Sequence, residues 1–142
     1  DFWSRFIDHL RTEHPGLTRA KSPQALSWFS TGVRVSGFSV GTAFTGDGHF
    51  RVELYIDTGN KEQNKRAFLE LKESKLLIEE GVGEPLDWTE IPDRRASRIS
   101  LLQNGTIDDT PEQLQEYIVW GAAGMAKIRH VFSPLLKRLT LA

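Results

Sequence analysis

The sequence predicts a single α+β domain with a largely antiparallel five-stranded sheet, in the order helix, three strands, helix, two strands, helix. Three observations support this fold class. Stretches that alternate between apolar and polar residues come in runs instead of alternating singly with helical stretches. Two of these runs flank a glycine-rich link, which indicates a hairpin. The 142 residues suffice for one core, so we expect one domain over residues 1–142.

The first helix is predicted from an amphipathic stretch at the start of the chain. Its apolar residues recur at spacings of three and four, with polar side chains between them. The dipeptide Pro15-Gly16 ends the pattern. The apolar positions are Phe2, Trp3, Phe6, Ile7 and Leu10.

Three strands are predicted next, over residues 26–35, 37–44 and 49–57. The glycine-rich link at 45–48 supplies the turn between the second and the third. The third run alternates most cleanly, so it has one apolar and one polar face. The apolar face carries Phe50, Val52, Leu54 and Ile56, and the polar face carries Arg51, Glu53, Tyr55 and Asp57.

A second helix is predicted to begin at Asn60, whose side chain can accept a hydrogen bond from the amide of Gln63. Glycine and proline within 81–85 end this helix. Two short strands should follow, over residues 86–91 and 96–103. The buried stripe of the helix consists of Ala67, Phe68, Leu71 and Ile78.

The last helix has the clearest start in the chain, with Thr110 as the N-cap and Pro111 as the first helical residue. Pro134 is expected to kink or end it. Its apolar and small residues follow a four-three alternation, which suits either the core of the domain or a homodimer interface. The core is the commoner use of such a seam, and the dimer stays an alternative. The candidate interface residues are Leu114, Ile118, Gly121, Met125 and Ile128.

Composition narrows the functional classes. The chain has 18 Lys plus Arg and 19 Asp plus Glu, and its net charge of −1 excludes binding to nucleic acid by overall charge alone. The absence of Cys excludes disulfides and thiolate metal sites and favours a reducing, cytoplasmic location. No apolar run approaches the ~18 residues that a membrane helix needs, so we expect no membrane partner.

Catalytic motifs are missing from the sequence. His9 and Glu13 have one-turn spacing, but a zinc site of that type needs a second His there and a further ligand. We therefore expect no cofactor, no metal and no catalytic residue, in a domain that is not an enzyme by itself. The alternative is a metal-dependent nuclease-like enzyme. It would use Glu53 and Asp57, which share a sheet face but lie about 13 Å apart, so it would need further ligands from elsewhere.

The polar face of the sheet is the most informative feature for function. Arginines and one tyrosine there could stack on or hydrogen-bond a base, bind phosphate, or dock a protein. The alternative is that the arginines only pair with Glu53 in a solvated face. The candidate ligand or nucleic-acid-binding residues are Arg51, Glu53, Tyr55, Arg94, Arg95 and Arg98.

Four short motifs occur in order along the chain: Phe2-Trp3-Ser4-Arg5-Phe6, Arg51-Val52-Glu53-Leu54-Tyr55-Ile56, Gly83-Glu84-Pro85-Leu86-Asp87-Trp88 and Ala96-Ser97-Arg98-Ile99. Together they resemble a bacterial domain family of unknown function that is about as long as this chain. Members of that family often form the C-terminal part of longer proteins whose front part resembles a restriction-endonuclease-like nuclease. The resemblance implies an accessory module in DNA processing or genome defence, with a fused or associated nuclease domain as a partner. The missing initiator Met agrees with a C-terminal part.

The predicted element order is also similar to that of small dimeric secretion chaperones, although those proteins are usually markedly acidic. We therefore predict an accessory domain that binds nucleic acid or a protein partner. The alternatives are the metal-dependent nuclease-like enzyme and a homodimerisation or chaperone-like interaction module.

Overall fold

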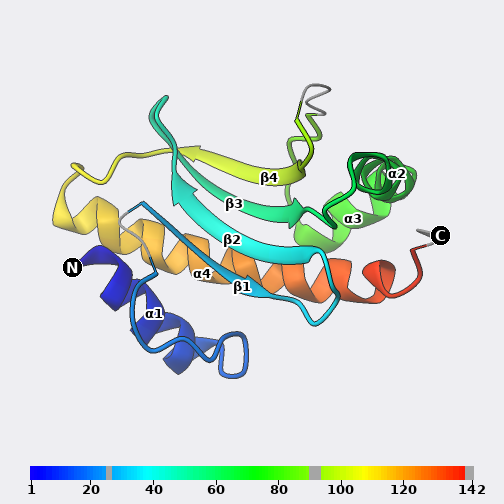
Figure 1. Ribbon diagram of the computed structural model, residues 1–142. Helices are drawn as coiled ribbons and strands as arrows, with labels where there is room; N and C mark the ends of the chain where they lie inside the picture. Colours follow the sequence, from blue (N-terminus) through cyan, green and yellow to red (C-terminus); the bar gives the residue numbers. More distant parts are fainter. Residues whose placement is uncertain (25–26, 90–93, 140–142) are drawn as a thin grey trace.

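The computed structural model describes residues 1–24, 27–89 and 94–139. Within these residues, four helices and four strands follow one another in the order α1, β1, β2, β3, α2, α3, β4, α4 (Figure 1). Their bounds are Phe2–Glu13 for α1, Trp28–Gly32 for β1, Phe38–Phe44 for β2, His49–Ile56 for β3, Lys61–Lys72 for α2, Lys75–Val82 for α3, Ser97–Asn104 for β4 and Pro111–Leu136 for α4.

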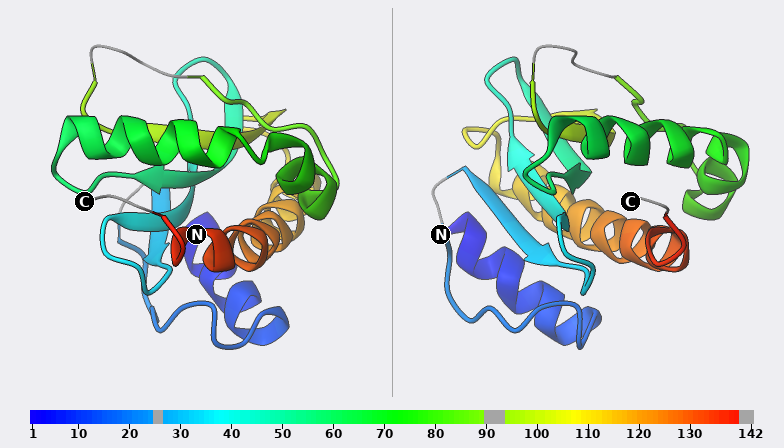
Figure 2. Two further views of the ribbon diagram at one scale, coloured as in Figure 1. Left: turned by 90° about the vertical axis from the view of Figure 1, so that its right-hand side faces the viewer. Right: turned by 45° about the vertical axis from the view of Figure 1, so that its right-hand side comes forward.

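The four strands form one antiparallel sheet in the order β1-β2-β3-β4. The long helix α4 runs along one face of this sheet, with α1 beside it (Figures 1 and 2). The pair α2 and α3 lies at the end of the sheet where β3 finishes (Figure 1). The fold is therefore α+β, as predicted. Helix α4 covers one face of the sheet, and the opposite face points away from α4.

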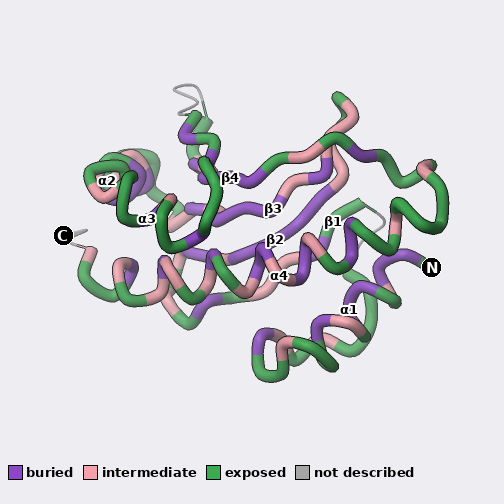
Figure 3. Tube along the Cα trace, turned by 180° about the vertical axis from the view of Figure 1, so that it is seen from behind, coloured by how far each residue is buried: buried purple, intermediate pink, exposed green. Residues whose placement is uncertain are grey.

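The core lies between the covered face and α4. Phe50, Val52 and Leu54 alternate along β3 on this side and are fully buried. Two glycines let α4 come close: a Cβ atom at Gly121 would lie 2.9 Å from the ring of Phe50, and one at Gly124 would lie 3.3 Å from Val52. Figure 3 shows the long buried stretches of β2 and β3 and the alternation of buried and exposed turns along α4.

The prediction of a five-stranded sheet is wrong, because β4 is the last strand of a four-stranded one. Of the strand predicted over 86–91, a single bridge remains, in which Asp87 pairs with Ser100; residues 90 and 91 lie outside the described part. The cause is a side chain of α3. The carboxylate of Glu79 accepts hydrogen bonds from the amide of Leu86 at 2.7 Å and the indole of Trp88 at 3.1 Å. These bonds hold Leu86 and Trp88 to α3, so that among the described residues of this segment only Asp87 pairs with β4.

The predicted order of elements is also wrong, because the second helix is split into α2 and α3. The break falls at Glu73 and Ser74, and the helices on its two sides pack on different surfaces. Helix α2 packs on β3 and β4, whereas α3 packs on α4 and buries Ile78 and Val82. Figure 2 shows α3 turning away from the axis of α2. One straight helix could not reach both surfaces.

The predicted helix starts are confirmed. Asn60 caps α2 and accepts a hydrogen bond from the amide of Gln63 at 3.0 Å. Thr110 caps α4 in a capping box with Gln113, and Pro111 is the first helical residue. Pro134 lies inside α4, which ends two residues later at Leu136. Among the described helices, none combines the length and the apolar character needed to cross a membrane.

One buried asparagine joins the end of β3, the start of α2 and the segment before β4. Asn64 accepts hydrogen bonds through Oδ1 from the amide of Thr58 at 2.7 Å and from its hydroxyl at 2.8 Å. Its Nδ2 donates to the carbonyl of Arg95 at 3.0 Å and to Asp57 Oδ1 at 3.2 Å. This network holds the entrance of β4 beside the end of β3, and so fixes which side chains of the two strands face one another.

Candidate functional site

The candidate site lies on the sheet face opposite α4. Alternation along β3 sends Arg51, Glu53 and Tyr55 to this face, because their neighbours point into the core. The strand register then brings residues of all four strands into rows across the face. The rows are Trp28, Ala43, Arg51 and Leu102; Ser30, Gly41, Glu53 and Ser100; and Gly32, Ser39, Tyr55 and Arg98.

Glu53 occupies the middle of this face and is only 7% exposed. Its cross-strand neighbours are the small residues Gly41 and Ser100, which leave room for the carboxylate on the sheet. Arginines lie on two sides of it. Glu53 Oε1 accepts a hydrogen bond from Arg51 Nε at 3.1 Å, and Oε2 lies 2.7 Å from Arg98 Nε. Burial of a carboxylate is costly unless opposite charges lie beside it, and the two arginines supply them.

The contact between Glu53 and Arg98 is an ion pair without a well-directed hydrogen bond. Glu53 Oε2 and Arg98 Nε are both buried, and neither has a hydrogen-bond partner of good geometry among the described residues. Buried polar atoms are normally hydrogen-bonded to protein, water or a ligand. The two atoms are therefore held together by charge and are closed to solvent, so a ligand reaches them only when a side chain of the pair moves.

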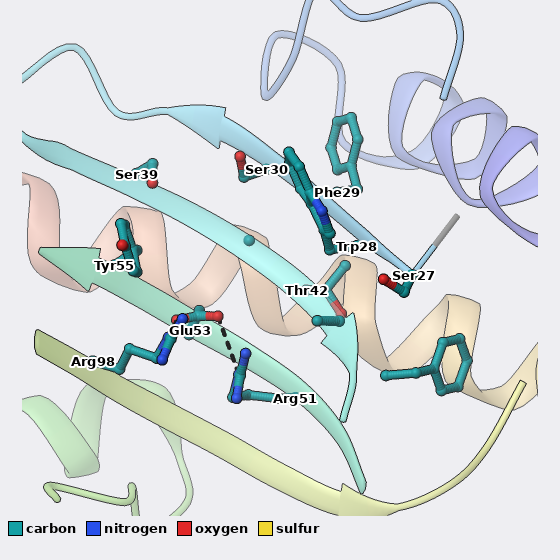
Figure 4. A pocket seen from close by; sticks show the side chains of 13 residues that line it. Ser27, Trp28, Phe29, Ser30, Ser39, Thr42, Arg51, Glu53, Tyr55 and Arg98 are labelled. Carbon is teal, nitrogen blue, oxygen red and sulfur yellow. Dashed lines mark hydrogen bonds and ion pairs between the residues drawn. The ribbon is translucent and has the colours of Figure 1, made fainter. Parts of the chain in front are cut away.

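Two aromatic side chains lie on the same face as the carboxylate. The guanidinium of Arg98 lies over the ring of Tyr55, 5.1 Å from its centroid. Trp28, on the edge strand β1, is 46% exposed. Figure 4 shows Glu53 between the two arginines, with Tyr55 and Trp28 on different sides.

Together these side chains line a cavity of about 480 Å³, a size suited to a small organic group. We call this cavity the sheet-face hollow. Serines from β1 and β2 are also part of its lining. The residues that define it are Trp28, Arg51, Glu53, Tyr55 and Arg98.

Of the six predicted binding residues, the structure brings four together in the hollow and leaves two outside. Arg95 forms an ion pair with Asp57, with Nη2 and Oδ2 2.7 Å apart. Their hydrogen bond raises the pKa of Arg95 and lowers the pKa of Asp57. Arg94 is exposed and does not line the hollow.

The two carboxylates of the nuclease alternative are both engaged by arginines. Glu53 lies between Arg51 and Arg98, and Asp57 pairs with Arg95. Over the residues that the structure describes, no group of three or more His, Asp or Glu side chains is placed to hold a metal ion. The geometry of the hollow suits recognition of a ligand that has both hydrogen-bond donors and negative charge.

The four-three seam of α4 faces the sheet of its own chain. Its residues Ile118, Gly121, Met125 and Ile128 are buried, and Leu114 is partly buried against the same core. These side chains are therefore engaged within the domain and do not form an exposed surface.

Trp28 and Gly41 are parts of the hollow that sequence reasoning missed as site residues. The signal in the sequence is weak: Trp28, Ser30 and Gly32 alternate along β1, so one large aromatic precedes two small residues on one face. Their position opposite Ala43, Gly41 and Ser39 depends on the register between β1 and β2.

Comparison with known proteins gives a family but no described function. A family model described as "Domain of unknown function (DUF4268)" matches residues 1–136. Because the match spans nearly the whole sequence, the chain belongs to this family. No curated protein and no solved structure matches the chain. The expected membership in a family of unknown function is confirmed.

Proposed function

We propose that this member of the DUF4268 family is a non-catalytic module that binds single-stranded nucleic acid in the sheet-face hollow. The observation that carries the proposal is the buried Glu53, with an oxygen that lacks a well-directed hydrogen bond, between two arginines and two aromatic rings. The motif resemblance supports a bacterial, nuclease-associated context in which such a module would bring a fused or separate nuclease to its DNA.

The chemistry of the hollow matches a nucleotide part by part. Aromatic rings stack on bases. Trp28 supplies an exposed ring, and Tyr55 supplies a partly buried ring with Arg98 over it. A carboxylate accepts hydrogen bonds from exocyclic amino groups, which cytosine carries and thymine lacks. The guanidinium groups of Arg51 and Arg98 keep further N–H groups for phosphate oxygens. We therefore expect Glu53 to select the base and the arginines to hold the backbone.

The charge of the hollow predicts how binding depends on salt. Two arginines and one carboxylate leave a single net positive charge in the hollow, so its long-range electrostatic attraction for an oligonucleotide is weak. Two phosphate contacts on a single strand correspond to a slope of about −1.4 in a plot of log K against log salt.

Fluorescence anisotropy with short oligo-dC and oligo-dT tests the proposal. We expect oligo-dC to bind more tightly than oligo-dT, and Glu53→Gln to reduce this preference, because the amide presents one acceptor and one donor instead of two acceptors. Glu84→Gln, an exposed carboxylate outside the hollow, is the matched control and should leave the preference unchanged.

Loss of stacking provides the second arm. Removal of both arginines would leave Glu53 buried without a counter-charge, which endangers folding. Trp28→Ala avoids this problem, because Trp28 is half exposed, and it should weaken binding by about tenfold through the lost stacking. The double variant Arg94→Ala with Arg138→Ala controls for charge outside the hollow. The proposal fails if neither oligonucleotide binds, or if Trp28→Ala and Glu53→Gln leave binding unchanged.

A further inference from the structure

A second cavity, of about 430 Å³, lies outside the sheet-face hollow, where β1 ends at Gly32. The loop after α1 forms one wall and α4 contributes another. Three arginines from separate parts of the chain line it, namely Arg19, Arg34 and Arg129. Among its described lining residues none is acidic, so this cavity differs in kind from the hollow that contains Glu53.

The three arginines have no carboxylate partner among the described residues. Arg129 is held by one hydrogen bond, which its Nη1 donates to the carbonyl of Gly16 at 3.0 Å. Arg19 and Arg34 are exposed. Three positive charges around one cavity repel one another unless an anion or solvent lies between them. The cavity therefore has the charge pattern of an anion site.

Arg34 has a backbone conformation that an arginine rarely adopts. Its φ is +63°, and it is the only non-glycine residue in the described part of the chain with a positive φ. Glycine would take this conformation without the clash of a Cβ atom. Such positions occur in turns, and they also cluster at ligand sites. Arg34 lies in the turn between β1 and β2, and it lines the cavity.

We propose that this cavity, the arginine cavity of Arg19, Arg34 and Arg129, binds a phosphate group. Guanidinium groups hold phosphate oxygens through paired N–H bonds, and three of them can contact different oxygens of one group. Thr31, from β1, adds a hydroxyl to the lining.

The phosphate can come from two sources. One source is the backbone of a strand bound in the sheet-face hollow, which would pass round the edge strand β1: Ser30 lines the hollow on the face opposite α4, and Gly32 lines the arginine cavity beside α4. The other source is a free phosphorylated small molecule. The first source rests on the proposed function, whereas the second does not.

The first arm titrates the chain with pyrophosphate and follows the backbone amides by NMR. We expect saturable shifts at Gly16, Gly32 and Arg34. Arg34→Gly should weaken binding by about tenfold, the size of a lost charge-assisted hydrogen bond. This variant does not endanger folding, because glycine adopts the backbone of Arg34 freely. Lys61→Ala with Lys137→Ala, two exposed lysines that line neither cavity, is the matched control and should bind pyrophosphate as the original chain does.

The second arm measures oligonucleotide affinity against salt. If the strand backbone is the source, Arg34→Gly should make the slope shallower by about 0.7, the share of one phosphate contact, and keep the preference for oligo-dC. If a free phosphorylated molecule is the source, Arg34→Gly weakens the binding of pyrophosphate and leaves the binding of oligonucleotides unchanged. The proposal is overturned if Arg34→Gly and Arg129→Gln change the affinity for neither pyrophosphate nor the oligonucleotide. If oligonucleotides do not bind but pyrophosphate does, the proposed function fails and the arginine cavity stands.

Discussion

At the scale of single residues, Gly121 sets how closely α4 approaches the sheet. A Cβ atom there would lie 2.9 Å from the ring of Phe50 and 3.0 Å from the ring of Phe6. Both rings are fully buried, so they have little room to move away. Close packing at this position therefore depends on the absence of a side chain.

Gly121→Ala is expected to lower the free energy of unfolding by about 1–2 kcal/mol. Overpacking costs ~1–3 kcal/mol, and the better helix propensity of alanine offsets up to about 1 kcal/mol of it. Gly124→Ala is the matched control: its Cβ atom would lie 3.3 Å from a methyl group of Val52, so the destabilisation should be smaller. Urea unfolding of both variants measures the difference. A Gly121→Ala variant at least as stable as Gly124→Ala would contradict this role.

The candidate site could be predicted only in part, and the reason lies in its separate residues. Arg51, Glu53 and Tyr55 follow from alternation within one strand, which is local information. Arg98 joins them through the pairing of β3 with β4. Trp28 could not be placed, because its position depends on the register between β1 and β2. Arg95 is not in the hollow, because Asp57 holds its side chain elsewhere.

At the scale of secondary-structure elements, Asn64 connects three segments through its four hydrogen bonds. Asn64→Ala should lower the free energy of unfolding by about 2–4 kcal/mol, because it leaves buried partners without hydrogen bonds. Asn60→Ala removes only the cap of α2 and should cost about 1 kcal/mol. Chemical denaturation of the two variants compares a connecting asparagine with a capping one, and equal losses would argue against the connecting role.

The elements that the sequence predicted well are those fixed by neighbours in the chain. The caps at Asn60 and Thr110 each need a partner only three residues away, so their motifs suffice. The break at Ser74 and the missing fifth strand depend on distant contacts. Helix α3 turns to pack on α4, and Glu79 captures the segment that begins at Leu86. No local pattern contains those contacts.

At the scale of the whole molecule, the net charge of −1 conceals two differently charged cavities. The sheet-face hollow balances two arginines with Glu53, whereas the arginine cavity has no acid among its described lining residues. Overall charge therefore says little about what either cavity binds, and the local arrangement of charges decides it.

The free energy of unfolding should depend on pH both in acid and in alkaline solution. Hydrogen bonds from Arg95, the amide of Leu86 and Tyr117 lower the pKa values of Asp57, Glu79 and Asp109, respectively. Because these folded-state pKa values lie below the unfolded ones, their stabilisation is present above about pH 5 and is lost as the pH falls through the folded-state values. The hydrogen bond to Asp109 raises the pKa of Tyr117 to about 12, so its stabilisation is present below pH 10 and lost between about 10 and 12.

Urea unfolding across a pH series checks both limbs. We expect a plateau at intermediate pH and a fall of the free energy of unfolding on each side. Tyr117→Phe should remove part of the alkaline fall, and Tyr55→Phe, whose hydroxyl has no Asp109 beside it, is the control. An alkaline limb that Tyr117→Phe leaves unchanged would show that other groups cause it.

The hydrogen bonds that Glu79 makes also limit pairing of the sheet edge with other copies of the chain. Strand β4 ends the sheet, and an uncovered edge strand of eight residues is a template for pairing with another chain. Asp87 occupies the backbone groups of Ser100 at the middle of that edge, with separations of 2.7 and 3.1 Å, and Glu79 anchors the residues on either side of Asp87. The carboxylate of Glu79 thus helps to keep this edge covered and unavailable to another chain. Protonation of Glu79 in acid would weaken its hydrogen bonds to Leu86 and Trp88 and uncover the edge of β4.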